Sequence, residues 1–343
     1  MRRIDIHTHL LPESLPRWSE RFGYGGFIRL EPLGPAGTTH CRARMVRDDG
    51  TFFRELEANA WDPMVRLREC DEAEVGVQVL STVPVMFSYG IPARDALEVA
   101  RFLNDRLAEV CARHPARFLG LGTLPMQDPE LASLELERCV RDLGLCGAQI
   151  GTHVGPWNLD APEVFAVLAR AAELSAAIFV HPWDMLAPER MKKYWLPWLV
   201  GMPAECALAI ASLIFAGVLE RLPTLRIAFA HGGGAFPATL GRIQHGFEAR
   251  PDLCAVDNPY PPEKYVKQIY VDGLVHDRRA LRLLLDVFGP ERIAVGSDYP
   301  FPLGEARPGA LVESMGLDKE TVERLLVGTA LEWLGRDRAG LLL

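Results

Sequence analysis

Two histidines near the start of the chain, His7 and His9, have the residue type and the spacing to bind a metal ion. They end an apolar run that begins at Ile4. Because alternate residues of a strand point to the same face, both imidazoles would lie side by side. Neutral imidazoles are common ligands of divalent ions. Alone, the pair would fit equally a core histidine next to a turn histidine, so the metal interpretation depends on further ligands.

Three more residues that can bind metal or move protons follow short apolar runs. His181 precedes Pro182, His231 precedes three glycines, and Asp298 comes just after the last apolar run. Each alone fits an ordinary role: a hydrogen-bonded turn residue, a helix N-cap and a structural cap. Only the fold can bring these residues together with His7 and His9.

Short apolar runs alternate with helical segments through most of the chain. This alternation predicts parallel βαβ units, and eight strands favour a closed (β/α)8 barrel over an open sheet. The predicted strands are residues 4–9, 75–82, 118–124, 147–151, 177–181, 225–231, 268–272 and 293–296. The predicted helices are residues 64–74, 93–114, 129–143, 162–174, 204–215, 236–247 and 278–288. Residues 10–62 are rich in turn residues and predict a small irregular or β-type insertion in a single domain of residues 1–343.

The predicted barrel turns the scattered residues into one site, since barrel enzymes carry their active sites at the C-terminal ends of the strands. Three histidines and a carboxylate suit zinc or a similar ion and leave a position for water. The predicted ligands are His7, His9, His181 and Asp298. His231 remains free as general acid or base, and Asp298 could also orient the water. The fourth strand has no lysine to bridge a second ion, so one metal is expected.

Composition excludes several classes of function. Of 343 residues, 49% are hydrophobic and 24% are charged, as in ordinary globular proteins, and the net charge of -8 gives no basic field for nucleic acid. The apolar segment 208–219 is too short to span a bilayer, so no membrane partner is expected. Seven cysteines without C-x-x-C spacing, and no secretory signal after Met1, predict reduced thiols and a cytosolic protein.

Seven short stretches, in this order, carry a family resemblance: residues 21–26, 81–89, 149–153, 181–185, 195–198, 231–234 and 297–305. The chain resembles the amidohydrolase superfamily and, within it, non-oxidative decarboxylases of the tryptophan–kynurenine pathway. The resemblance implies the same four metal ligands, one zinc ion per subunit, and His231 as the catalytic acid or base.

The resemblance also implies residues that bind a dicarboxylate substrate. These are Arg54, Arg242 and Trp198, with Arg242 reaching the active site of the neighbouring subunit in a homodimer. A guanidinium group recognises a carboxylate bidentately, which suits such a substrate. From the residues alone, a surface salt bridge would explain either arginine, and core packing would explain Trp198 and Phe301.

The implied activity is that of a zinc-dependent carboxy-lyase. Either a hydroxide adds to the conjugated substrate, or the carbon bearing the departing carboxylate is protonated, and the residues do not decide between these routes. Close relatives carry a lysine where this chain has Arg47-Asp48, which leaves the fine substrate preference open. Two alternatives remain: a related decarboxylase or hydrolase of another aromatic or unsaturated carboxylate, and a non-enzymatic protein that keeps the metal for stability or binds a ligand.

Overall fold

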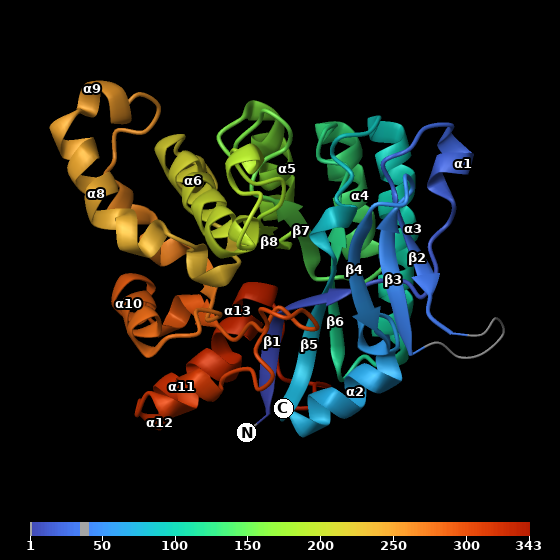
Figure 1. The fold of residues 1–343 in the computed structure, drawn as a ribbon. Helices are drawn as coiled ribbons and strands as arrows, with labels where there is room; N and C mark the ends of the chain where they lie inside the picture. Colours follow the sequence, from blue (N-terminus) through green and yellow to red (C-terminus); the bar gives the residue numbers. More distant parts are fainter. Residues whose placement is uncertain (1, 35–40) are drawn as a thin grey trace.

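A barrel of eight parallel strands forms the centre of the protein, as a computed structural model describing residues 2–34 and 41–343 shows (Figure 1). The strands follow one another around the barrel in chain order. They are β1 (Arg3–Leu10), β5 (Val75–Thr82), β6 (Phe118–Thr123), β7 (Gly147–Gly151), β8 (Ala177–His181), β9 (Arg226–Phe229), β10 (Tyr270–Asp272) and β11 (Ile293–Ala294). The last strand meets the first where the Ile6 N–H donates to the Val295 carbonyl at 2.9 Å. The predicted (β/α)8 fold is confirmed.

Two strands that lead to predicted site residues end earlier than predicted. The sixth and eighth were expected over residues 225–231 and 293–296, but β9 ends at Phe229 and β11 at Ala294. His231 and Asp298 therefore lie in turns beyond the strand ends, with φ of 56° and 57°. Such left-handed turns reverse the chain sharply and direct both side chains over the mouth of the barrel.

Helices cover the barrel strands on the outside. The longer ones are α2 (Pro63–Glu72), α3 (Ala93–Arg113), α4 (Pro129–Arg141), α5 (Pro162–Glu173), α6 (Met202–Phe215), α8 (Phe236–Ala249) and α10 (Arg278–Phe288). Short helices are α1 (Trp18–Phe22), α7 (Val218–Arg221), α9 (Pro251–Cys254), α11 (Ala310–Ser314), α12 (Lys319–Glu323) and α13 (Thr329–Leu334). The sequence pattern predicts none of the helices α11 to α13. Trp333 of α13 is fully buried, and its ring lies 5.9 Å from that of Phe179 in β8.

A small antiparallel sheet lies beside the barrel, within the predicted insertion of residues 10–62. It consists of β2 (Ile28–Pro32), β3 (Arg42–Arg47) and β4 (Phe52–Glu57). Residues 35–40 of this insertion lie outside the described part of the chain. The sheet packs on its own apolar cluster, which includes Trp18, Phe27 and Met45.

One helical segment is longer than the apolar segment 208–219 on which the membrane prediction rested. The helix does not begin near residue 204 but continues from Pro197 to Phe215, a length of 19 residues, through a π-turn (Pro197–Gly201) that leads into α6. By length and composition alone, this helix could cross a membrane. However, Cys206, Ile210 and Leu213 are buried in the barrel core, as expected for the core helix of a globular protein.

Candidate metal-dependent active site

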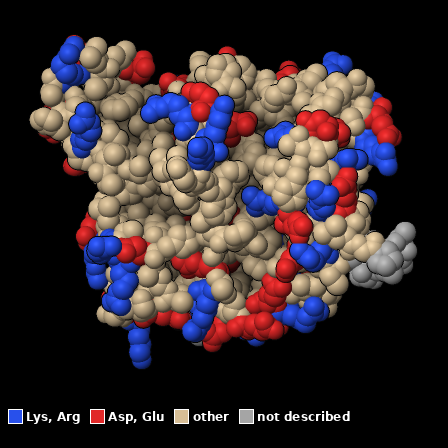
Figure 2. All heavy atoms as spheres, in the orientation of Figure 1, with Lys and Arg blue, Asp and Glu red and all other residues tan. Residues whose placement is uncertain are grey.

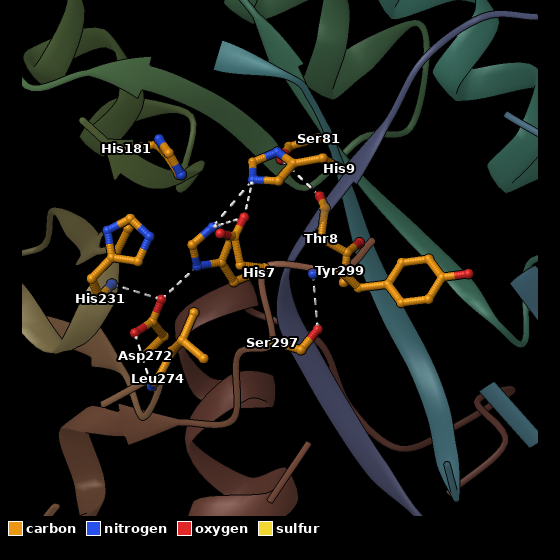
Figure 3. Close-up of polar contacts among 12 residues, drawn as sticks. His7, Thr8, His9, Ser81, His181, His231, Asp272, Leu274, Ser297 and Tyr299 are labelled. Carbon is orange, nitrogen blue, oxygen red and sulfur yellow. Dashed lines mark hydrogen bonds and ion pairs between the residues drawn. The ribbon is translucent and has the colours of Figure 1, made fainter. Parts of the chain in front are cut away.

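Four side chains converge at the mouth of the barrel. One ligand atom from each of His7, His9, His181 and Asp298 lies within 4.8 Å of all the others. The Nε2 atoms of His7 and His9 are 3.2 Å apart, and Asp298 Oδ1 lies 3.0 Å from His9 Nε2 and 3.5 Å from His7 Nε2. Figure 3 shows the three histidine rings facing a common centre. The structure therefore brings together all four predicted ligands.

The outer hydrogen bonds of the three histidines assign their tautomers. His7 Nδ1 lies 2.7 Å from Asp272 Oδ2, His9 Nδ1 lies 3.0 Å from the carbonyl of Thr82, and His181 Nδ1 lies 2.9 Å from that of Pro182. Carbonyls and carboxylates only accept, so each Nδ1 carries the proton and each neutral ring presents its Nε2 lone pair to the centre. His181 Nε2 is buried with no hydrogen-bond partner among the described residues. Three inward lone pairs and one carboxylate fit a divalent cation.

The surroundings hold most of these groups in the form that binds metal. Burial lowers the pKa of His9 and, with the charge of His7, lowers that of His181 far below its ordinary value. Burial acts to raise the pKa of Asp298, but the contact with His9 and the charges of His7, His9 and His231 together outweigh burial and bring the pKa to about 2. Burial also opposes the charged form of His7, but Asp272 and Asp298 outweigh it and raise the pKa of His7. A proton therefore competes with a cation for Nε2 more strongly at His7 than at His9 or His181.

His231 lies beside this centre without being part of it. Its ring centroid is 5.2 Å from that of His7 and 5.1 Å from that of His181. Its Nδ1 is buried and has no hydrogen-bond partner in the described part of the chain. Burial, followed by the charge of His7, lowers its pKa to about 4, so that the ring is neutral at pH 7. A neutral imidazole at this position can accept a proton from a bound molecule and return it.

Asp272 connects His7 with His231, and the sequence analysis missed it. Its Oδ2 accepts from His7 Nδ1 at 2.7 Å and from the backbone N–H of His231 at 3.0 Å, while its Oδ1 accepts from the N–H of Gly232 at 2.8 Å (Figure 3). Burial alone would raise its pKa, but the bond and charge of His7 outweigh burial and lower it. The predicted strand 268–272 ends on this residue, so the strand-end argument, applied to the seventh strand, would have found it.

A narrow cavity opens on His9 and Asp298, and its remaining walls are mainly apolar and aromatic. Arg54 is the only Lys or Arg that lines it within residues 2–34 and 41–343. The Arg54 guanidinium carbon lies 4.3 Å from the ring centre of Phe301 and 5.2 Å from that of Phe53. These rings hold the cation without using its hydrogen-bond donors, which leaves the donors for an anionic group in the cavity.

The other predicted substrate residues are not all in this cavity. Trp198 lines it, next to Trp195 at a ring distance of 5.9 Å. Arg242 lies on an exposed face of α8, outside the cavity-lining set. Arg47 also lies outside the cavity-lining set. It is close enough to Asp184 to act on it: burial raises the pKa of Asp184, and the charge of Arg47 partly offsets this rise. One chain alone therefore brings together Arg54 and Trp198 but not Arg242.

The fourth barrel strand shows why a second metal has no bridging ligand. β7 contains no lysine, and its Gln149 is fully buried. Its amide oxygen accepts from Ser81 Oγ, and its Nε2 donates to the Thr82 carbonyl, both at 2.8 Å. The same carbonyl accepts from His9 Nδ1, so Gln149 supports a ligand histidine rather than binding a cation.

Comparisons with known proteins find relatives in sequence and in structure. A sequence model of the amidohydrolase family matches residues 4–336. A 2-amino-3-carboxymuconate-6-semialdehyde decarboxylase from Dictyostelium discoideum is 52% identical, with 98% of this chain and 92% of that protein covered. A protein of the same name from Caenorhabditis elegans is 41% identical, with 91% and 88% covered. A dihydroxybenzoic acid decarboxylase from Polaromonas sp. JS666, solved with manganese and 2-nitroresorcinol, has a TM-score of 0.71 at 23% identity and covers 97% of each chain.

Proposed function

This chain belongs to the amidohydrolase family, and we propose that it is a metal-dependent, non-oxidative decarboxylase. Its substrate is 2-amino-3-carboxymuconate 6-semialdehyde, which it converts to 2-aminomuconate 6-semialdehyde in tryptophan catabolism. The observation that carries the proposal is the convergence of three Nε2 lone pairs and Asp298 beside the neutral ring of His231. The identity of 52% with a relative of that name supports the choice of substrate.

Each residue around the cavity has a separate role in the proposed reaction. Arg54 binds a substrate carboxylate and is held in place by the rings of Phe53 and Phe301. The aromatic walls exclude water and pack against the conjugated chain of the substrate. His231 takes up a proton from solvent water and delivers it to the carbon that loses CO2, so that a C–H bond replaces the broken C–C bond. When bound, a divalent ion would supply Lewis-acid stabilisation of the developing negative charge.

We propose zinc as the ion, at one per subunit. Three imidazole nitrogens and one carboxylate oxygen form the mixed donor set that zinc favours, and no cysteine is in the cluster. The Polaromonas protein was solved with manganese, so the identity of the ion needs a direct test. Metal analysis of protein purified without added metal should give about one zinc per chain. A different metal at that stoichiometry would correct the choice of ion and leave the site unchanged.

We also propose a homodimer in which Arg242 enters the neighbouring active site. Arg54 is the one cation that lines the cavity in the described chain, whereas the substrate carries two carboxylates. Leu199 and Val200, on the segment that carries Trp198, are exposed apolar residues that a second copy could cover. The predicted dimer should be visible by sedimentation.

Mixing two inactive variants tests the shared site. In a heterodimer of Arg242→Met and His231→Ala chains, one site has both defects and the other has neither. Random exchange should therefore restore about a quarter of the wild-type activity, since half the dimers are mixed. If the mixture stays inactive although exchange is verified, Arg242 does not act across the interface.

A cytosolic location remains part of the proposal. All seven cysteines are free thiols in the structure, which suits a reducing compartment. Fractionation of the source cells should place the protein in the soluble fraction. Recovery with membranes would instead give the Pro197–Phe215 helix a second role.

An activity assay separates the proposed substrate from the alternatives. The metal-loaded protein should abolish the near-ultraviolet absorbance of 2-amino-3-carboxymuconate 6-semialdehyde and release CO2. A parallel assay with dihydroxybenzoates tests the aromatic-carboxylate alternative. Turnover of only the dihydroxybenzoates would change the substrate but keep the reaction class. No turnover of any carboxylate by protein that retains the metal would favour a non-enzymatic metal protein.

A further inference from the structure

We propose that Arg66, on the outer helix α2, is a positioning residue that holds two metal-binding segments of the barrel together. The inference rests on the proposed metal site and adds to it a residue that lies outside the cavity. Arg66 is fully buried, yet it makes no salt bridge within the described part of the chain. A buried guanidinium without an ion-pair partner needs a reason for its presence.

The two segments that Arg66 joins are the end of β1 and the turn after β11. They are linked directly through their backbones, since the Asp298 N–H donates to the His7 carbonyl at 2.9 Å and the His9 N–H donates to the Tyr299 carbonyl at 2.8 Å. Three of the four predicted ligands thus lie along one short junction. Its geometry sets the 3.0 Å separation between His9 Nε2 and Asp298 Oδ1.

Arg66 contacts both sides of this junction. On the β1 side its Nη2 donates to the carbonyl of His9. On the other side its guanidinium carbon lies 4.6 Å from the ring centre of Tyr299. Further hydrogen bonds of 3.1 Å each, to the Asn59 carbonyl and to Gln78 Oε1, fix the guanidinium plane. Arg66 therefore restrains the residues that carry or adjoin His9 and Asp298.

Stability alone does not account for this arrangement. Replacing a buried charged group by an apolar side chain of similar volume is often neutral or stabilising. The contacts that the charge does make lie on the metal-ligand junction, which points to a role in ligand geometry.

Strand β1, which carries His7 and His9, offers a matched control. Arg3, at the opposite end of β1, is 1% exposed. It donates to the carbonyl of Pro308 at 2.6 Å and forms ion pairs of 3.1 Å with Glu74 and Glu313. Arg3 is thus as buried as Arg66 and lies on the strand that carries His7 and His9, but its side chain bonds to none of the ligand residues.

The test compares Arg66→Met with Arg3→Met in metal affinity and in the visible spectrum of the cobalt-substituted protein. Because outer residues orient the ligands, Arg66→Met should weaken zinc binding about 10- to 100-fold and change the cobalt d–d bands. Arg3→Met should lower the thermal midpoint of the metal-free protein and leave zinc affinity and the cobalt spectrum unchanged. Equal zinc affinities in the two variants would overturn the inference. If the wild-type chain binds no metal, the proposed function and this inference fail together.

A second pair of variants decides the matter if Arg66→Met does not fold. Tyr299→Phe keeps the ring face under the guanidinium, whereas Tyr299→Leu removes it. Zinc affinity and the cobalt bands should stay close to wild type for Tyr299→Phe and shift for Tyr299→Leu. The same response in both variants would show that the contact between Arg66 and the ring does not position the ligands.

Discussion

Glu305 offers a quantitative test of the electrostatics behind the site. It follows β11, its side chain is 16% exposed, and its carboxyl lies 3.9 Å from His276 Nδ1. Burial, with the charge of Asp272 adding to it, raises its pKa from the ordinary value of 4.5 to about 7. The folded state therefore keeps a proton that the unfolded chain has lost, which corresponds to about 3 kcal/mol of lost stability once the pH exceeds both values.

The sign follows from the direction of the shift. Below pH 4.5 the carboxyl is protonated in both states and contributes nothing. Between 4.5 and about 7 the folded state binds more protons than the unfolded state, so the free energy of unfolding falls as the pH rises. Glu305→Gln removes the ionisation and keeps an oxygen that can accept the N–H of Gly309. Its stability relative to wild type should therefore rise through this window, toward about 3 kcal/mol at pH 8.

Guanidinium unfolding of the metal-free protein at several values between pH 5 and 8 measures this difference. Asp277→Asn serves as the control, because hydrogen bonds to Arg279 hold the pKa of Asp277 at about 2. The stability that the Asp277 carboxylate contributes is fully present above pH 3.8 and is lost as the pH falls toward 2. The stability difference between Asp277→Asn and wild type should therefore be constant between pH 5 and 8. A pH-independent difference for Glu305→Gln would refute the raised pKa of Glu305 and the repulsion by Asp272.

The remaining predictions concern the site itself. His231→Ala should retain zinc while turnover falls about 10²- to 10⁴-fold. Metal analysis and the activity assay measure the two quantities, and loss of the metal would indicate that His231 is a ligand. Asp272→Asn should weaken zinc binding about 10- to 100-fold, because the amide cannot orient His7 as a carboxylate does. Titration with zinc measures the affinity, and an unchanged value would contradict the assigned tautomer of His7. Phe301→Leu should raise KM more than it lowers kcat, since it frees Arg54 while keeping all four metal ligands; a fall in kcat alone would argue against this role. Chelation should lower the thermal midpoint, and zinc at 100 times its Kd should restore about 2.7 kcal/mol; equal midpoints with and without zinc would argue against a native-state site.

The sequence predicted the fold and the cluster because both depend on local patterns. Strand alternation placed His7 and His9 on one face, and the rule for strand ends gathered His181 and Asp298. Arg66 could not be found in this way. It lies in α2, a helix rich in charged residues, where an arginine is normally exposed, and only the assembled barrel buries it. The short helices α11 to α13 follow the last strand, where the alternation that guided the prediction has ended.

The hydrogen-bond partners of the histidine Nδ1 atoms explain why the tautomers of the ligands could not be predicted from the sequence. His9 and His181 are oriented by the carbonyls of Thr82 and Pro182, and His7 by the carboxylate of Asp272. Every residue has a carbonyl, so only the path of the backbone determines which one meets an imidazole, whereas a carboxylate is visible in the sequence. The identity of the ligands is therefore encoded in side chains at strand ends, but two of the three tautomers that prepare them for a cation are encoded in the barrel backbone. A chain that kept all the ligand residues but redirected the turns after β5 and β8 would lose the inward lone pairs on which the proposed chemistry depends.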